Sequence, residues 1–212
     1  MNKLLKLLAI AAAAGFALAS GSAMAEATYG YNSTGAGTVI ATARVNVIVN
    51  VPRLILLRVG ADSTAVDTLT FNAAFSGIPG GITAAALTTA GTGNSLASPW
   101  SGAAPTFSAP ATQALTASAW TNSSGGGQLG LASTVTTALA GISPTDITVV
   151  PTAGAGALPA HPGTTASNAN IGTFTRNTVH SASWAYGISA ASLAAAAAGT
   201  YAQTTTYTAT SL

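Results

Sequence analysis

The sequence predicts an all-β protein, an antiparallel β-sandwich of Ig-like or pilin-like type with about eight strands. Short stretches in which apolar and polar residues alternate recur along the chain, and this period of two is typical of half-buried strands. Stretches rich in Gly, Pro, Ser and Asn separate them and supply turns. The one helical pattern is the short Ala-rich stretch 190–199, too short for a core helix.

The first element is a predicted signal peptide over residues 1–25. Lys3 and Lys6 precede an apolar run, and Ala23 and Ala25 fit the small-x-small rule for cleavage. This pattern predicts export to the periplasm, the cell surface or the medium, and a mature chain without a transmembrane segment. We expect one sandwich domain over residues 38–212, preceded by a flexible lead.

The mature chain is predicted to carry no net charge. Loss of Lys3 and Lys6 from the six basic residues leaves four, against four acidic ones. They are Arg44, Arg53, Arg58 and Arg176 against Glu26, Asp62, Asp67 and Asp146. This balance argues against a nucleic-acid partner. It also leaves little repulsion between copies, which favours self-association or association with other surface subunits. The chain has no cysteine, so no disulfide can stabilise it.

After a flexible lead at 26–37, residues 38–51 alternate most regularly. Valines occupy every second position at the end of this stretch, and Pro52 interrupts it. They are Val45, Val47, Val49 and Val51. We expect a central strand that packs these valines into the core, with a bulge or edge at Pro52. A second hypothesis is that the stretch exchanges strands between subunits.

Further strands are expected at 54–59, 66–75, 113–120, 127–133, 145–151, 171–177, 179–188 and 199–210. Residues 76–81, SGIPGG, have the glycine and proline content of a turn. Residues 121–126 predict a hairpin turn between the strands on either side. The stretches 82–113 and 151–170 are expected to be long loops, rich in small residues and proline.

No residue pattern predicts catalysis or a cofactor. Residues 125–130, GGGQLG, match the G-x-G-x-x-G pattern of dinucleotide-binding proteins. That site requires a helix directly after the glycines, and the residues that follow here are poor helix formers. His161 is expected in a loop, PAHPG, that contains no other titratable residue, and His180 is expected on a strand. No G-x-S-x-G motif accompanies them. Two histidines without cysteine also make a poor zinc site, so we expect a non-enzyme without a bound metal.

Two weaker candidates for ligand binding remain. Asp62 and Asp67 flank a short loop, where turn-forming aspartates are favoured over a calcium site. Trp120 and Trp184 are expected in the core because they lie on predicted strands, whereas Trp100 lies in a loop. Trp100 is therefore the candidate aromatic for stacking on a sugar.

The C-terminal stretch AAGTYAQTTTYTATS, Ala197 to Ser211, resembles the closing strand of secreted bacterial β-sandwich domains of the spore coat protein U type, found in fimbria-like subunits. It is also similar to surface domains of the WxL type, although the chain has no W-x-L tripeptide. The resemblance implies a secreted sandwich that assembles with other subunits. The expected role is an exported structural or surface-adhesive protein, with a secreted carbohydrate-binding module as the alternative.

Overall fold

The computed structural model describes residues 26–61, 65–78 and 99–212. The predicted signal peptide with Ala23 and Ala25, the residue Asp62 and most of the expected loop at 82–113 lie outside these residues. The chain divides into two units at Val51 and Pro52. The compact unit that holds the sandwich therefore begins at Pro52, later than the expected start at residue 38.

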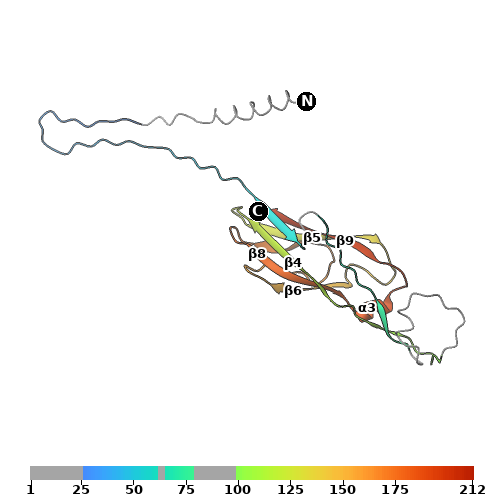
Figure 1. Cartoon of the computed structure of the whole chain (residues 1–212). Helices are drawn as coiled ribbons and strands as arrows, with labels where there is room; N and C mark the ends of the chain where they lie inside the picture. The colour runs from blue at the N-terminus through green and yellow to red at the C-terminus, as the bar shows by residue number, and fades with distance from the viewer. Residues whose placement is uncertain (1–25, 62–64, 79–98) are drawn as a thin grey trace, which may run out of the picture. The chain divides into compact units, whose positions relative to one another are not determined.

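Among the described residues of the second unit, all strand pairing is antiparallel, in two main sheets and one small one (Figure 1). The four-stranded sheet has the order β1 (Ile55–Val59), β4 (Gln113–Thr121), β8 (His180–Ile188) and β6 (Ile147–Ala153). The three-stranded sheet has the order β7 (Asn168–Phe174), β5 (Gly127–Thr137) and β9 (Ala202–Ser211). The small sheet pairs β2 (Ala74–Gly77) with β3 (Thr106–Ser108).

The core lies between the two main sheets. Trp184 and Ala117 from the four-stranded sheet and Leu129 from the three-stranded sheet are fully buried in one apolar cluster. Burial alternates with a period of two along β4 and β8, as expected for strands with one face on a core. The prediction of an all-β sandwich is confirmed. Trp184 is a core residue as predicted, but Trp120 is only half-buried.

The helix α3 (Ala190–Ala195) is shorter than the Ala-rich stretch that predicts it. Ser189 caps it, because its side chain accepts a hydrogen bond from the backbone N–H of Ser192. No helix in the part of the chain that the structure describes is long and apolar enough to cross a membrane.

The hairpin predicted across residues 121–126 is wrong, because β4 and β5 belong to different sheets. Ala117 and Ala119 of β4 face the same core as Leu129 of β5, so the two strands lie in opposite layers. Gly126, at φ +79°, ends the crossing between them. Each strand finds its partners elsewhere in the chain, β4 in β1 and β8, and β5 in β7 and β9.

The strand predicted at 66–75 forms only in part. Ordered pairing begins at Ala74 in β2. Residues 66–73 have no assigned strand, yet Leu69 and Phe71 pack half-buried against the core. The Gln113 side chain holds this segment by donating to the carbonyl oxygen of Thr70 at 2.7 Å.

The largest correction concerns residues 38–51. The predicted central strand is absent from both main sheets, and all residues from 26 to 51 are exposed. The core prediction for Val45, Val47, Val49 and Val51 is therefore wrong, since each side chain is 74–79% exposed. The alternating pattern indicates a strand, but the buried cluster of the sandwich is formed by residues between Ala117 and Tyr186, from β4 and the elements that follow it.

Candidate assembly site

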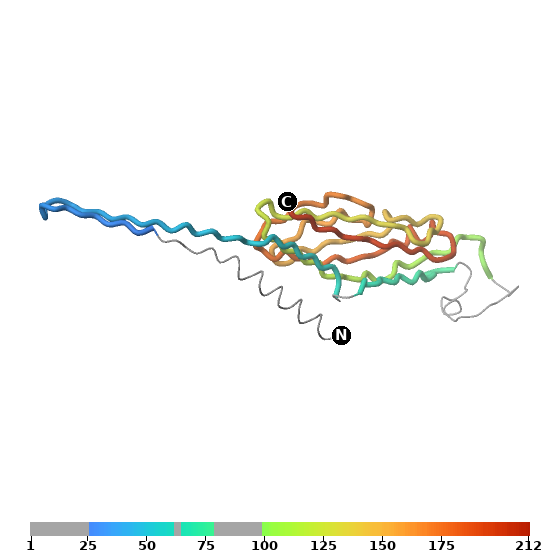
Figure 2. The backbone as a smooth tube through the Cα atoms, turned by 90° about the horizontal axis from the view of Figure 1, so that it is seen from above, coloured from blue at the N-terminus to red at the C-terminus, as the bar shows by residue number. Residues whose placement is uncertain are grey.

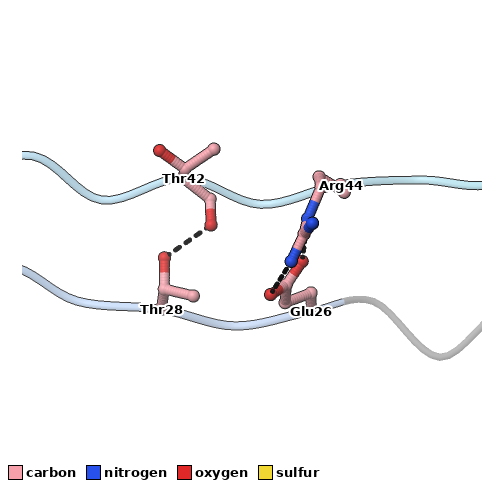
Figure 3. A network of polar contacts seen from close by, with 4 residues as sticks. All are labelled: Glu26, Thr28, Thr42 and Arg44. Carbon is pink, nitrogen blue, oxygen red and sulfur yellow. Dashed lines mark hydrogen bonds and ion pairs between the residues drawn. The ribbon is translucent and has the colours of Figure 1, made fainter.

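Residues 26–51 form an arm whose first part folds back along the chain. The stretches 26–31 and 38–44 run side by side (Figure 2). The Thr28 hydroxyl donates to the carbonyl oxygen of Thr42 at 2.8 Å, and the Arg44 guanidinium donates to the Glu26 carboxylate at 3.1 and 3.2 Å (Figure 3). The hydrogen bond that Arg44 donates to Glu26 raises the pKa of Arg44. Exposed ion pairs of this kind contribute little stability.

The second part of the arm, residues 45–51, presents an unusual surface. Its four valines share one face by their period of two, and each is at least 74% exposed. Asn46 and Asn50 lie between them, together with Ile48, which is 83% exposed. A contiguous exposed apolar row of this kind marks an interaction surface in a soluble protein.

The sandwich has a partly exposed apolar surface at the edge strands β1 and β9, here called the open side. Among the described residues, each pairs on one edge only, β1 with β4 and β9 with β5, and the two strands lie close together across the sheets. Their inward side chains are only half-buried against the core. These are Ile55, Leu57 and Val59 of β1 with Tyr207 and Ala209 of β9.

The strand β9 is the longest of the four edge strands in the two main sheets. It extends over ten residues, against five in β1. The outer edge of β6 is covered by residues 163–165, because Val149 donates to the carbonyl oxygen of Gly163 and Thr165 donates to that of Ile147. Edge strands carry unpaired backbone N–H and C=O groups that accept a further strand.

Asn122 fixes the backbone where the compact unit begins. Its side chain accepts from the backbone N–H of Leu54 at 2.8 Å and donates to the carbonyl oxygen of Pro52 at 2.7 Å. Thr121 donates to the carbonyl oxygen of Leu54 at 2.9 Å. These bonds hold the start of β1 on the end of β4.

The other sequence candidates do not converge on one site. Trp100 is 59% exposed, and its indole N–H donates to the carbonyl oxygen of Ala103 at 2.7 Å. Asp67 accepts from the backbone N–H of Ala61 at 2.7 Å, which is the role of a turn-forming aspartate. No group of three potential metal ligands occurs among the described residues. Residues 125–130 lead into an antiparallel strand instead of a helix.

His161 has no titratable neighbour within its own loop, but the fold brings tyrosines from β8 and β9 against its ring. Its ring is 5% exposed, and its Nε2 lies 2.9 Å from the Tyr207 hydroxyl, which lies 2.8 Å from the hydroxyl of Tyr186. Burial lowers the pKa of His161 to about 4 and raises the pKa values of Tyr186 and Tyr207. No local signal could reveal this network, because its members are 21 and 46 residues apart.

Asp146 joins the loop before β6 to α3. The hydroxyl and backbone N–H of Ser143 donate to one carboxylate oxygen, and the hydroxyl of Ser192 donates to the other. These hydrogen bonds, chiefly the one from the Ser143 side chain, lower the pKa of Asp146 although burial opposes them. The arrangement is that of a structural carboxylate.

Comparisons with protein-family models, with curated proteins and with solved structures found no match to this chain. The functional argument therefore depends on the geometry of the arm, the open side and the exposed aromatic residue.

Proposed function

We propose that this chain is an exported structural subunit that assembles with copies of itself at the cell surface or outside the cell. In this proposal, residues 45–51 of one copy pair with the β9 edge of another copy, and their valines fill the open side of its sandwich. The observation that carries the proposal is the row of four exposed valines in an extended arm.

The chemistry of the two surfaces favours this pairing. The valine row is apolar and has a period of two, and the half-buried side chains of β1 and β9 are also apolar or aromatic. Strand addition gives affinity through main-chain hydrogen bonds and specificity through alternate side chains. The balance of four basic and four acidic residues in the mature chain removes long-range repulsion between copies.

The magnitudes are sufficient for a stable contact. Burial of a valine side chain contributes about 1.5 kcal/mol, so four contribute about 6 kcal/mol. Main-chain hydrogen bonds over seven residues add about 0.5–1.5 kcal/mol each. Together these terms offset an association cost of about 4–15 kcal/mol.

The test is the oligomeric state of residues 26–212 and of residues 52–212. Light scattering after size-exclusion chromatography, with electron microscopy of the same samples, should find oligomers or filaments only for the longer chain. A monomeric 26–212 chain at high concentration, or equal oligomers from both chains, would contradict the proposal.

A second candidate function, from a different class, is carbohydrate binding. It is favoured by the exposure of Trp100 and by the partly exposed ring pair Phe75 and Phe107, whose centroids lie 4.6 Å apart. Exposed aromatic rings stack on the apolar faces of sugars. A glycan array with the wild type and Trp100→Ala tests it, because loss of a specific signal in the variant would support binding through this residue.

A further inference from the structure

Residues 159–164 cross the edge of β6 between two anchors, and we refer to them as the strap. Leu158 anchors one end, since it is 5% exposed and its N–H donates to the carbonyl oxygen of Ser181 at 3.2 Å. Thr165 anchors the other end at 1% exposure, with its backbone bonded to β6 and its side chain accepting from Gln203 of β9. At the centre of β6, the Val149 N–H donates to the strap at Gly163 O, 2.8 Å away.

His161 attaches the middle of the strap to the core. The backbone N–H of Gly163 donates to its Nδ1 at 3.3 Å, so Nδ1 is an acceptor and the hydrogen of the neutral ring is on Nε2. Nε2 then donates to the Tyr207 hydroxyl at 2.9 Å. The ring also packs edge-on against Trp184, with centroids 5.1 Å apart.

A second proton on His161 cannot be accommodated in this arrangement. A protonated Nδ1 would point its N–H at the N–H of Gly163, and the charged ring would be buried against aromatic side chains. The titratable groups that face the ring are the phenols of Tyr186 from β8 and Tyr207 from β9. Burial raises the pKa values of both phenols, so neither supplies a negative charge in acid.

His180 provides an internal contrast. Its ring is also 5% exposed, but its Nδ1 faces the carbonyl oxygens of Gly156 and Ala157 at 2.6 and 3.1 Å. Its Nε2 lies 3.0 Å from the carbonyl oxygen of Thr175. Acceptors therefore surround both of its nitrogens, whereas His161 faces a donor on one side.

We propose that the strap is an acid-released cover of the β6 edge, and that protonation of His161 detaches its middle while Leu158 and Thr165 hold its ends. Release uncovers the backbone of Val149 and the aromatic rings beneath the histidine. The strap and the proposed assembly share Tyr207 of β9, but release concerns the β6 edge and assembly concerns the β9 edge, so each proposal can fail without the other.

The expected change in the opening equilibrium of the strap follows from the pKa of His161 in the closed and open states. With the strap closed the pKa of His161 is about 4, and with the strap open it returns to its ordinary value near 6.5. Above pH 6.5 the ring is neutral in both states, so the closed strap has its full stability. As the pH falls from 6.5 to 4, the open state gains the proton first, and the opening equilibrium rises about 100-fold.

The experiment is amide hydrogen exchange of the 26–212 chain by NMR at pH 7, 6, 5 and 4, expressed as protection factors. The Val149 amide should lose about 100-fold protection by pH 4, while the Thr165 amide and the ladder amides of β8 keep theirs. In His161→Gln, an amide that offers one donor and one acceptor without titrating, the Val149 loss should vanish. In the matched variant His180→Gln it should persist.

Three results would overturn the proposal. The first is constant protection of Val149 across this pH range in the wild type. The second is an equal loss in β8, because that means global unfolding. The third is an unchanged loss in His161→Gln. If that variant does not fold, the ring of His161 can be titrated by NMR in the wild type. A titration of the ring that does not follow the pH range in which Val149 loses protection would also refute the proposal.

Discussion

Replacement of Val47 by arginine tests the assembly proposal most directly. Val47 is 79% exposed, so the substitution should change the free energy of unfolding by less than about 0.5 kcal/mol. In the proposed contact the same side chain lies in the open side of a neighbouring copy. The variant should therefore fold normally and assemble poorly.

The loss of binding free energy between copies that we expect for Val47→Arg has two parts. Loss of one valine side chain from the contact costs about 1.5 kcal/mol, which weakens the dissociation constant about tenfold. A guanidinium directed at the half-buried residues Leu57 and Tyr207 adds a desolvation cost of at least about 2 kcal/mol. Together they predict a contact weaker by more than about 100-fold.

Ile48→Arg is the matched control, because Ile48 is the next residue, is 83% exposed and lies on the opposite face of the extended arm. Its side chain would point away from the neighbour, so this variant should assemble within about threefold of the wild type. The assay is light scattering across a concentration series, with circular dichroism to check folding. A folded Val47→Arg chain that still assembles would contradict the proposed contact. Equal loss of assembly in both variants would contradict the assignment of the valine face to the neighbouring copy.

The absence of cysteine in the chain allows the acceptor edge to be tested by disulfide trapping. Chains with Val49→Cys mixed with chains carrying Ala209→Cys on β9 should form a mixed disulfide dimer under mild oxidation. Chains with Ile48→Cys in place of Val49→Cys should not form this mixed disulfide, because the side chain at position 48 lies on the other face of the arm. Trapping by Ile48→Cys but not by Val49→Cys would place the wrong face of the arm against β9.

The remaining predictions concern the stability of the sandwich unit, measured by denaturant unfolding. Asn122→Ala removes both side-chain bonds to the backbone before β1 and should cost about 1–2 kcal/mol; an unchanged unfolding midpoint would contradict the role assigned to this side chain. Asp146→Asn weakens the bonds from Ser143 and Ser192 and should cost about 1 kcal/mol. Because the folded pKa of Asp146 is lowered, its contribution is present above the ordinary pKa of an aspartate and is lost as the pH falls through the folded value. The variant should therefore show a smaller fall in stability below pH 4 than the wild type. Gly126→Ala, at φ +79° with the new Cβ 2.4 Å from the carbonyl oxygen of Phe174, should cost about 1–3 kcal/mol; a neutral result would show that the turn relaxes.

Several elements of the sandwich could be predicted because their signals are local. Alternation over 113–120 and 179–188 corresponds to β4 and β8, since a strand on a core shows its inner face in every second residue. The Ala-rich stretch before Gly199 contains α3, because alanine favours helix over a short length. Trp184 was correctly placed in the core for the same local reason.

Other features depend on partners that are distant in the sequence. A turn-rich stretch between two strands predicts a hairpin, but the chain at 121–126 crosses between sheets because β4 finds β1 and β8 while β5 finds β7 and β9. His161 is buried by β8 and β9, whose residues Tyr186 and Tyr207 come later in the chain. Which strands pair is decided by the burial of all inner faces together, and a single stretch does not contain that information.

Residue types and short-range spacing are enough to predict the β class, the alternation of most strands and the charge balance expected after removal of the predicted signal peptide. Which of the alternating stretches are buried depends on the fold as a whole. The stretch with the most regular valines is exposed in the arm, whereas β8, with mostly small side chains around Trp184 and Tyr186, lies at the centre of its sheet. Burial depends on which strands pair across the whole fold, and the buried cluster is formed by residues between Ala117 and Tyr186, without the valine stretch.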